Sequence, residues 1–169
     1  MRIWGLFLMF AGCAGGGIQY CAIQKKRLAL LRHTLSALEI LEGELGTSAL
    51  PMPELCQLLQ RHSELAVRDF FLELTQRMPE LGRRSFASIW RQAARCHLAG
   101  LGEAPMEAYL ALGEKLGRYE LEQQLSAVRQ CQRALRRSLE SAEAAYPAER
   151  KLGMGLSLSL GALLLILYL

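Results

Sequence analysis

Cys96 and His97 are the adjacent side chains in this sequence that are best suited to chemistry. A thiol beside an imidazole could act as a nucleophile with its general base. Neighbouring side chains on a helix point about 100° apart, so we do not expect these two to face each other. His97 is therefore interpreted as a partly buried core histidine, with an unrecognised catalytic site at Cys96 and His97 as the alternative.

The search for other catalytic or ligand-binding motifs is negative. The sequence contains no HExxH, no GxSxG and no phosphate-binding glycine loop, and its histidines have no partner at metal-ligand spacing. Glu39, Glu42 and Glu44, and the basic string RQCQRALRR at 129–137, are interpreted as solvated helix faces. The sequence thus predicts no enzyme activity, no cofactor, no metal site and no nucleic-acid partner.

Cys13 could undergo a different reaction, because FAGC at residues 10–13 is close to a bacterial lipoprotein cleavage box. Lipidation there would place everything that follows outside the cell. The apolar stretch before the box is short, only Arg2 precedes it, and the uncharged run continues to Ile23. We favour a retained membrane anchor, and a lipoprotein with an exported helical domain is the alternative.

Two uncharged apolar runs, at residues 3–23 and 152–169, are predicted to be transmembrane helices. At about 1.5 Å per residue the second run is just long enough to span a hydrocarbon core of about 30 Å. Basic residues cluster at the inner end of each run: Lys25, Lys26, Arg27, Arg150 and Lys151. By the positive-inside rule, we expect residues 25–149 to form a cytoplasmic domain of a cell-membrane protein with both termini outside.

Between the two runs, apolar residues recur at helical spacing, and no alternating strand pattern occurs. We predict an all-α cytoplasmic bundle of five to six helices between the N- and C-terminal transmembrane helices. A leucine-striped helix over 25–45 and a long helix over 119–146, whose seam includes Leu121, should lie side by side because each continues into an anchor. The clearest internal loop is predicted at 99–105. The core residues predicted for the intervening helices are Leu55, Leu58, Leu59, Val67, Phe70, Phe71, Leu74, Phe86, Ile89, Trp90, Ala93 and His97.

Small residues recur at a spacing of four in both apolar runs, namely Gly12 and Gly16 in the first and Gly153, Ser157 and Gly161 in the second. This spacing lets helix backbones approach closely in lipid, so these residues are candidates for packing the anchors together or against membrane partners. Glycine is also frequent in membrane helices generally, which is an equally good explanation.

Three strings along the chain carry a family resemblance: LRHTLSALEILEGELGTSALPMPEL at 31–55, LGEKLGRYELEQQLSAVRQCQRAL at 112–135 and ERKLGMGLSLSLGALLLILYL at 149–169. Together they resemble the stage III sporulation protein AB family of endospore-forming bacteria. That family is similar to the cytoplasmic helical domain of the type II secretion platform protein F, whose GE-x-x-G string resembles residues 113–117.

The resemblance implies a non-enzymatic platform in the mother-cell membrane. It would belong to the channel complex between mother cell and forespore, and would be required for endospore formation. The implied partners are a cytoplasmic secretion-type ATPase and other subunits of the complex. The residues expected to contact partners are Gly113, Glu114, Gly117, Pro51, Pro53 and Glu54.

The string at 113–117 also has a physical interpretation of its own. Glycines four apart let a helix approach its neighbour, and Gly117 could adopt the left-handed conformation that ends the helix. Glu114 is expected to be exposed between them. The string is either a partner site or a corner between helices. For the whole chain, a homo-oligomeric scaffold built on the 119–146 seam is the alternative.

Overall fold

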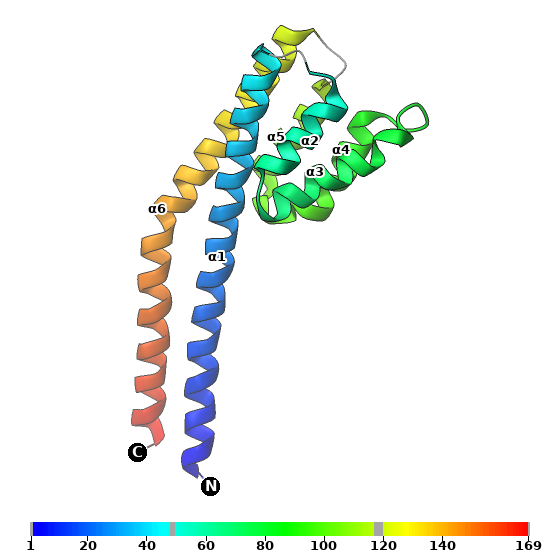
Figure 1. Cartoon of the computed structure of the whole chain (residues 1–169). Helices are drawn as coiled ribbons and strands as arrows, with labels where there is room; N and C mark the ends of the chain where they lie inside the picture. Colours follow the sequence, from blue (N-terminus) through cyan, green and yellow to red (C-terminus); the bar gives the residue numbers. More distant parts are fainter. Residues whose placement is uncertain (1, 48–49, 117–119, 169) are drawn as a thin grey trace. The chain divides into compact units, whose positions relative to one another are not determined.

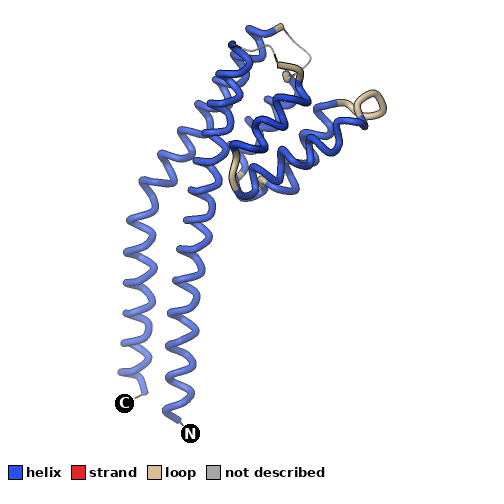
Figure 2. The backbone as a smooth tube through the Cα atoms, viewed as in Figure 1, coloured by secondary structure: helices blue, strands red, loops and turns tan. Residues whose placement is uncertain are grey.

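The computed structural model describes the backbone of residues 2–47, 50–116 and 120–168, and the side chains of residues 22–47, 50–116 and 120–144. Within these residues the chain is all-α, as predicted, with six α-helices and no strand (Figure 2). The helices are α1 (Arg2–Thr47), α2 (Met52–His62), α3 (Leu65–Arg77), α4 (Phe86–His97), α5 (Glu103–Lys115) and α6 (Leu121–Tyr168). Short 3-10 turns at Met78–Glu80 and Ala99–Leu101 follow α3 and α4.

The chain divides into two compact units, and α1 and α6 each contribute to both. Ala29–Glu140 form the bundle unit, which holds α2 to α5 and the adjoining lengths of α1 and α6 (Figure 1). It lies inside the predicted soluble domain at 25–149. Met1–Leu28 and Ser141–Leu169 form the other unit. Each long helix is therefore continuous from a predicted anchor into the bundle unit.

In the part of the chain whose side chains are described, no helix has a stretch long and apolar enough to span a membrane. The predicted runs at 3–23 and 152–169 lie almost wholly outside those residues. The same holds for the following predicted positions: Gly12, Cys13, Gly16, Arg150, Lys151, Gly153, Ser157 and Gly161. Lys25 and Lys26 are exposed, and Arg27 is half-buried.

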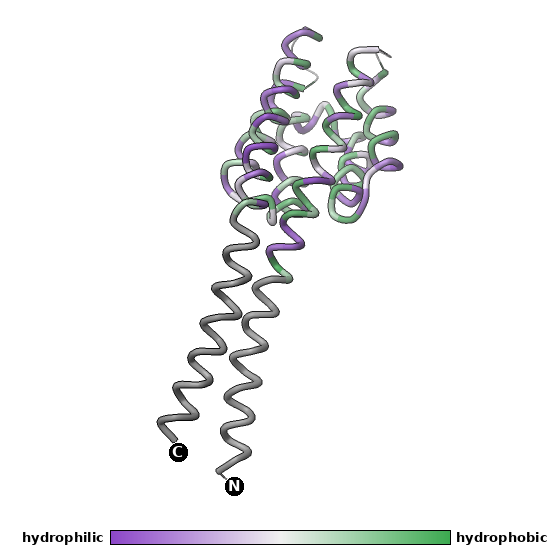
Figure 3. The backbone as a smooth tube through the Cα atoms, turned by 90° about the vertical axis from the view of Figure 1, so that its left-hand side faces the viewer, coloured by the Kyte–Doolittle hydropathy of each residue, from purple (hydrophilic) through white to green (hydrophobic). Residues whose placement is uncertain are grey.

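A core of leucines and aromatic rings holds the bundle unit together. The predicted leucine stripe is confirmed, since Leu31, Leu38 and Leu41 of α1 are buried. Full burial of one such side chain contributes about 1.5–3 kcal/mol. Hydrophobic and hydrophilic stretches alternate along the helices, as expected for helices with one buried face (Figure 3). The predicted core residues that are buried are Leu55, Leu59, Val67, Phe70, Phe71, Leu74, Ile89, Trp90 and Ala93.

Several core predictions need correction. Leu58 and Phe86 are only half-buried, whereas His97 is partly buried, as predicted. Leu121 is 46% exposed, because it is the first residue of α6 and stands ahead of the buried part of the seam. The loop predicted at 99–105 is also shorter than expected. A 3-10 turn occupies its first residues, Gly102 turns the chain with a φ of 93°, and α5 then begins.

An aromatic cluster joins α3, α4 and α5. The ring of Phe70 meets that of Trp90 edge-on with 4.9 Å between centroids, and Trp90 stacks on Tyr109 at the same separation. The indole N–H of Trp90 donates a hydrogen bond of 2.8 Å to the backbone oxygen of Tyr109. Burial raises the pKa of the Tyr109 hydroxyl well above its ordinary value. The indole ring is thus held on one side by Phe70 and on the other by Tyr109, which stacks on it and accepts its hydrogen bond.

Charged and polar side chains link α1 to α6 within the bundle unit. Arg129 Nε lies 2.6 Å from Glu42 Oε1, and Arg136 Nη2 lies 2.8 Å from Glu39 Oε1. Two residues of the predicted basic face thus pair with two of the predicted acidic face, while Arg129, Arg136 and Glu39 stay at least half exposed to solvent, as predicted. The hydrogen bond from Arg129 is the main reason that the pKa of Glu42 lies below its ordinary value.

Candidate functional site

Gly113 brings the end of α5 against the indole ring of Trp90 on α4. Gly113 is buried, and a Cβ placed there would lie 2.7 Å from the indole nitrogen and still closer to two ring carbons. No real side chain tolerates such contacts, so only glycine fits without moving the ring. The predicted close approach at Gly113 is thus confirmed. Gly117, predicted to share this role, lies outside the described residues.

Glu114 is exposed, as predicted, and it has an ion-pair partner that the sequence did not reveal. Its Oε1 lies 2.5 Å from Nη2 of Arg91 on α4, and the two side chains are 56% and 47% exposed. A pair this open to solvent contributes only about 0–1 kcal/mol. Both charges therefore stay accessible to a third group, so the position works as a helix corner without being closed to a partner.

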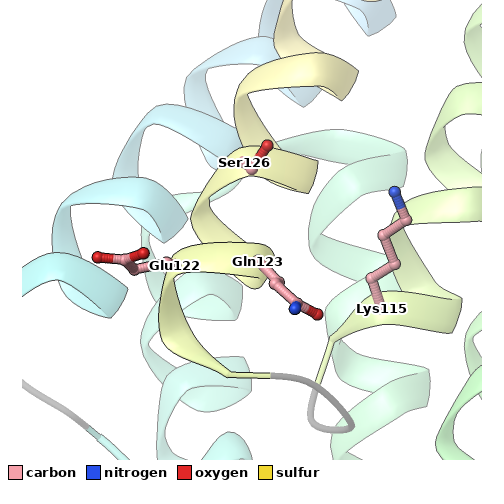
Figure 4. A pocket seen from close by; sticks show the side chains of 4 residues that line it. All are labelled: Lys115, Glu122, Gln123 and Ser126. Atoms are coloured by element: carbon pink, nitrogen blue, oxygen red, sulfur yellow. The ribbon is translucent and has the colours of Figure 1, made fainter.

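Lys115, the residue after Glu114, lines an open pocket of about 470 Å³ (Figure 4). Lys115 extends from the end of α5, while Glu122, Gln123 and Ser126 come from the first turns of α6. The four side chains named for this lining are polar and include both signs of charge. Such side chains can exchange hydrogen bonds and ion pairs with a polar group that enters the pocket.

A smaller groove of about 160 Å³ shares Lys115 with this pocket. Its other lining residues come from α5 and α6: Ala108, Ala111, Leu112, Ala127, Gln130, Cys131 and Ala134. Burial raises the pKa of the Cys131 thiol to about 12, so this thiol is neutral and unreactive at physiological pH. Sequence reasoning missed the groove because alanines on a helix carry no signal of the space that they leave.

Pro51, Pro53 and Glu54 are exposed at the start of α2. Pro51 is extended, with a ψ of 144°, and Pro53 stands in the first turn, where a missing N–H is tolerated. In the described part of the chain no hydrogen bond or ion pair joins these residues to Glu114. The two predicted sets of partner residues therefore belong to different helix ends.

Cys96 and His97 both lie near Glu73 of α3, but within the described residues no hydrogen bond joins the thiol to the imidazole, in line with the prediction. Nε2 of His97 lies 2.7 Å from Oε2 of Glu73, and the thiol of Cys96 lies within 4.8 Å of both groups. Neighbouring side chains leave a helix in different directions, yet both can bend toward a residue of an adjacent helix. Glu73, on α3, was missed because it is distant in sequence.

The sequence model of a family described as stage III sporulation protein AB matches residues 2–169. The chain belongs to the stage III sporulation protein AB family. The resemblance drawn from the three strings is thereby confirmed. A solved structure described as stage III sporulation protein AB (SpoIIIAB) shares the fold with a TM-score of 0.64 at 22% identity, over 72% of this chain and 97% of that one. No curated protein matches the sequence.

Proposed function

We propose that this chain is a non-enzymatic, membrane-anchored platform in the sporulation channel complex between mother cell and forespore, with a role required for endospore formation. The apolar runs at 3–23 and 152–169 would anchor it in the mother-cell membrane with both termini outside. Their basic inner flanks would keep the bundle unit in the cytoplasm. There it would dock a secretion-type ATPase and other subunits of the complex.

The observation that carries this proposal is the α5 corner, which we define as Arg91, Glu114, Lys115 and Glu122. Gly113 and the held ring of Trp90 give the corner a fixed backbone, while its charges stay exposed. A preorganised surface loses little entropy on binding, and exposed charges orient and select a protein partner. Both properties are those expected of a docking platform.

Burial within the bundle unit speaks against catalysis by Cys56 or Cys131 and against a homo-oligomeric scaffold. Burial raises the pKa values of the Cys56 and Cys131 thiols to about 12, which leaves them poor nucleophiles. Val128 and Leu135, on the seam of α6, are fully buried within the chain itself. A second copy therefore has little of that seam to bind, which speaks against a scaffold built on it.

The proposal is tested by binding the purified ATPase to the full chain in detergent micelles. Glu114→Lys breaks the pair with Arg91 and presents the wrong charge to the partner. Because a like-charge contact costs several kcal/mol, the affinity should fall at least about 10-fold. Asp69→Lys is the matched control, since Asp69 is an exposed acidic residue on α3, a helix that contributes no residue to the α5 corner.

The possible outcomes of this experiment distinguish a wrong function from a wrong docking site. If the wild-type chain does not bind the ATPase, the platform role is wrong. If it binds, but Glu114→Lys and Asp69→Lys bind equally well and keep their helical circular dichroism, the partner docks elsewhere on the bundle unit.

A further inference from the structure

We propose that Glu73, Cys96 and His97 form a binding site for a divalent transition-metal ion of the zinc type, which would link α3 to α4. A thiolate sulfur, an imidazole nitrogen and a carboxylate oxygen are the donors that bind zinc in proteins. Magnesium and calcium prefer all-oxygen sites, so this mixed set selects against them.

The three donor atoms are already gathered. All lie within 4.8 Å of one another, and His97 Nε2 is 2.7 Å from Glu73 Oε2. In a tetrahedral zinc site with bonds of about 2.0–2.3 Å, ligand atoms lie about 3.3–3.8 Å apart. The imidazole and carboxylate would therefore have to separate slightly, and the thiol would have to move inward. Cys96 is exposed, so its side chain can turn without disturbing the core.

Arg77 orients the carboxylate in a way that suits this role. Its Nη2 lies 2.7 Å from Oε1 of Glu73, which leaves Oε2 directed toward His97. Carboxylates that bind metals are commonly held in this way through hydrogen bonds to their other oxygen. The positive charge of Arg77 opposes the metal, but the carboxylate and the thiolate together supply two negative charges. With three protein ligands, a tetrahedral metal ion has a fourth coordination position, and water can reach it beside the exposed Cys96.

The competing explanation is a plain ion-pair network in which Glu73 joins Arg77 to His97. The side chains of Glu73 and His97 are only 15% and 27% exposed, so the pairing alone accounts for their positions. That network has no role for Cys96. The thiol therefore distinguishes the two explanations.

The test is a titration with Co²⁺ of the full chain in detergent, after treatment with a chelator and under reducing conditions. We expect one Co²⁺ per chain, a near-ultraviolet charge-transfer band from the thiolate–cobalt bond, visible bands of four-coordinate cobalt, and displacement by Zn²⁺. Cys96→Ser should abolish the charge-transfer band. Glu73→Gln and His97→Gln should each weaken Co²⁺ binding at least about 10-fold.

His62→Gln is the matched control, because His62 is an exposed histidine at the end of α2, and it should bind like the wild type. The exposed position of Cys96 makes Cys96→Ser the variant that best preserves the fold. Two results would overturn the proposal: no saturable binding of Co²⁺ or Zn²⁺ by the wild-type chain, or a charge-transfer band that persists in Cys96→Ser.

Discussion

At the scale of single residues, the absence of a side chain at position 113 decides how α5 packs on α4. Gly113→Ala would drive a methyl group into the indole ring of Trp90, which its hydrogen bond to Tyr109 holds in place. We expect the free energy of unfolding to fall by about 1–3 kcal/mol, as in other overpacked cores. Denaturant titration of the full chain measures this change.

Gly43→Ala is the control for that substitution. Gly43 also lies in a helix, but a Cβ there would meet nothing within 4 Å. Alanine is the better helix former, so this variant should be stabilised by up to about 1 kcal/mol. Equal effects of the two substitutions would show that Trp90 does not constrain position 113.

Glu42 makes the stability of the bundle unit depend on pH. Its pKa is lowered from 4.5, chiefly by the hydrogen bond from Arg129, so the pair stabilises the fold above that pH and loses its effect as the pH falls below it. Arg129→Met should lower the free energy of unfolding by about 0.2–1 kcal/mol at neutral pH. This difference should shrink in acid.

Unfolding of the wild type and Arg129→Met across the acidic range checks this pH dependence. Arg133→Met serves as the control, because Arg133 is exposed on the same helix and has no ion pair within the described residues. Its effect should not change below pH 4.5, the ordinary pKa of Glu42. An Arg129→Met effect that is equally independent of pH would contradict the assigned role of Glu42.

At the scale of elements, complementary charge contributes to the pairing of α1 with α6 in the bundle unit. Arg136→Glu sets a second carboxylate opposite Glu39 and should lower the free energy of unfolding by about 1 kcal/mol at low salt. Adding Glu39→Arg restores opposite charges and should recover most of the loss. Both differences should shrink in high salt, because exposed charges are screened. A double variant that is no more stable than Arg136→Glu would refute the pairing.

The helices could be predicted from the sequence because their signals are local. Apolar spacing identified the buried face of α3, and Ser85 was predicted as the N-cap of α4, where its hydroxyl accepts a hydrogen bond of 3.3 Å from the N–H of Ser88. Partners between helices could not be predicted. Arg129 is 87 positions from Glu42, and no local pattern relates them. The open pocket lined by Lys115 could not be predicted either, because its lining combines residues of α5 and α6.

At the scale of the whole molecule, the proposed function depends on the side of the membrane that holds the bundle unit. Because α1 and α6 each run unbroken from a predicted anchor into that unit, the orientation of the two anchors in the membrane determines which side of the membrane holds the unit. The basic residues at 25–27 and 150–151 favour the cytoplasm. Lipidation at Cys13 would place the unit on the opposite side, out of reach of any ATPase.

The most direct test is to label a reporter thiol in intact cells with a membrane-impermeant maleimide. Arg83→Cys in a Cys96→Ser background places the thiol in an exposed turn of the bundle unit. Cys56 and Cys131 can stay because they are buried and unreactive, with pKa values near 12. The Cys96→Ser variant without the reporter cysteine measures any background labelling of Cys13 and Cys21. We predict labelling of the reporter only after permeabilisation. Labelling in intact cells, above that background, would contradict a cytoplasmic platform.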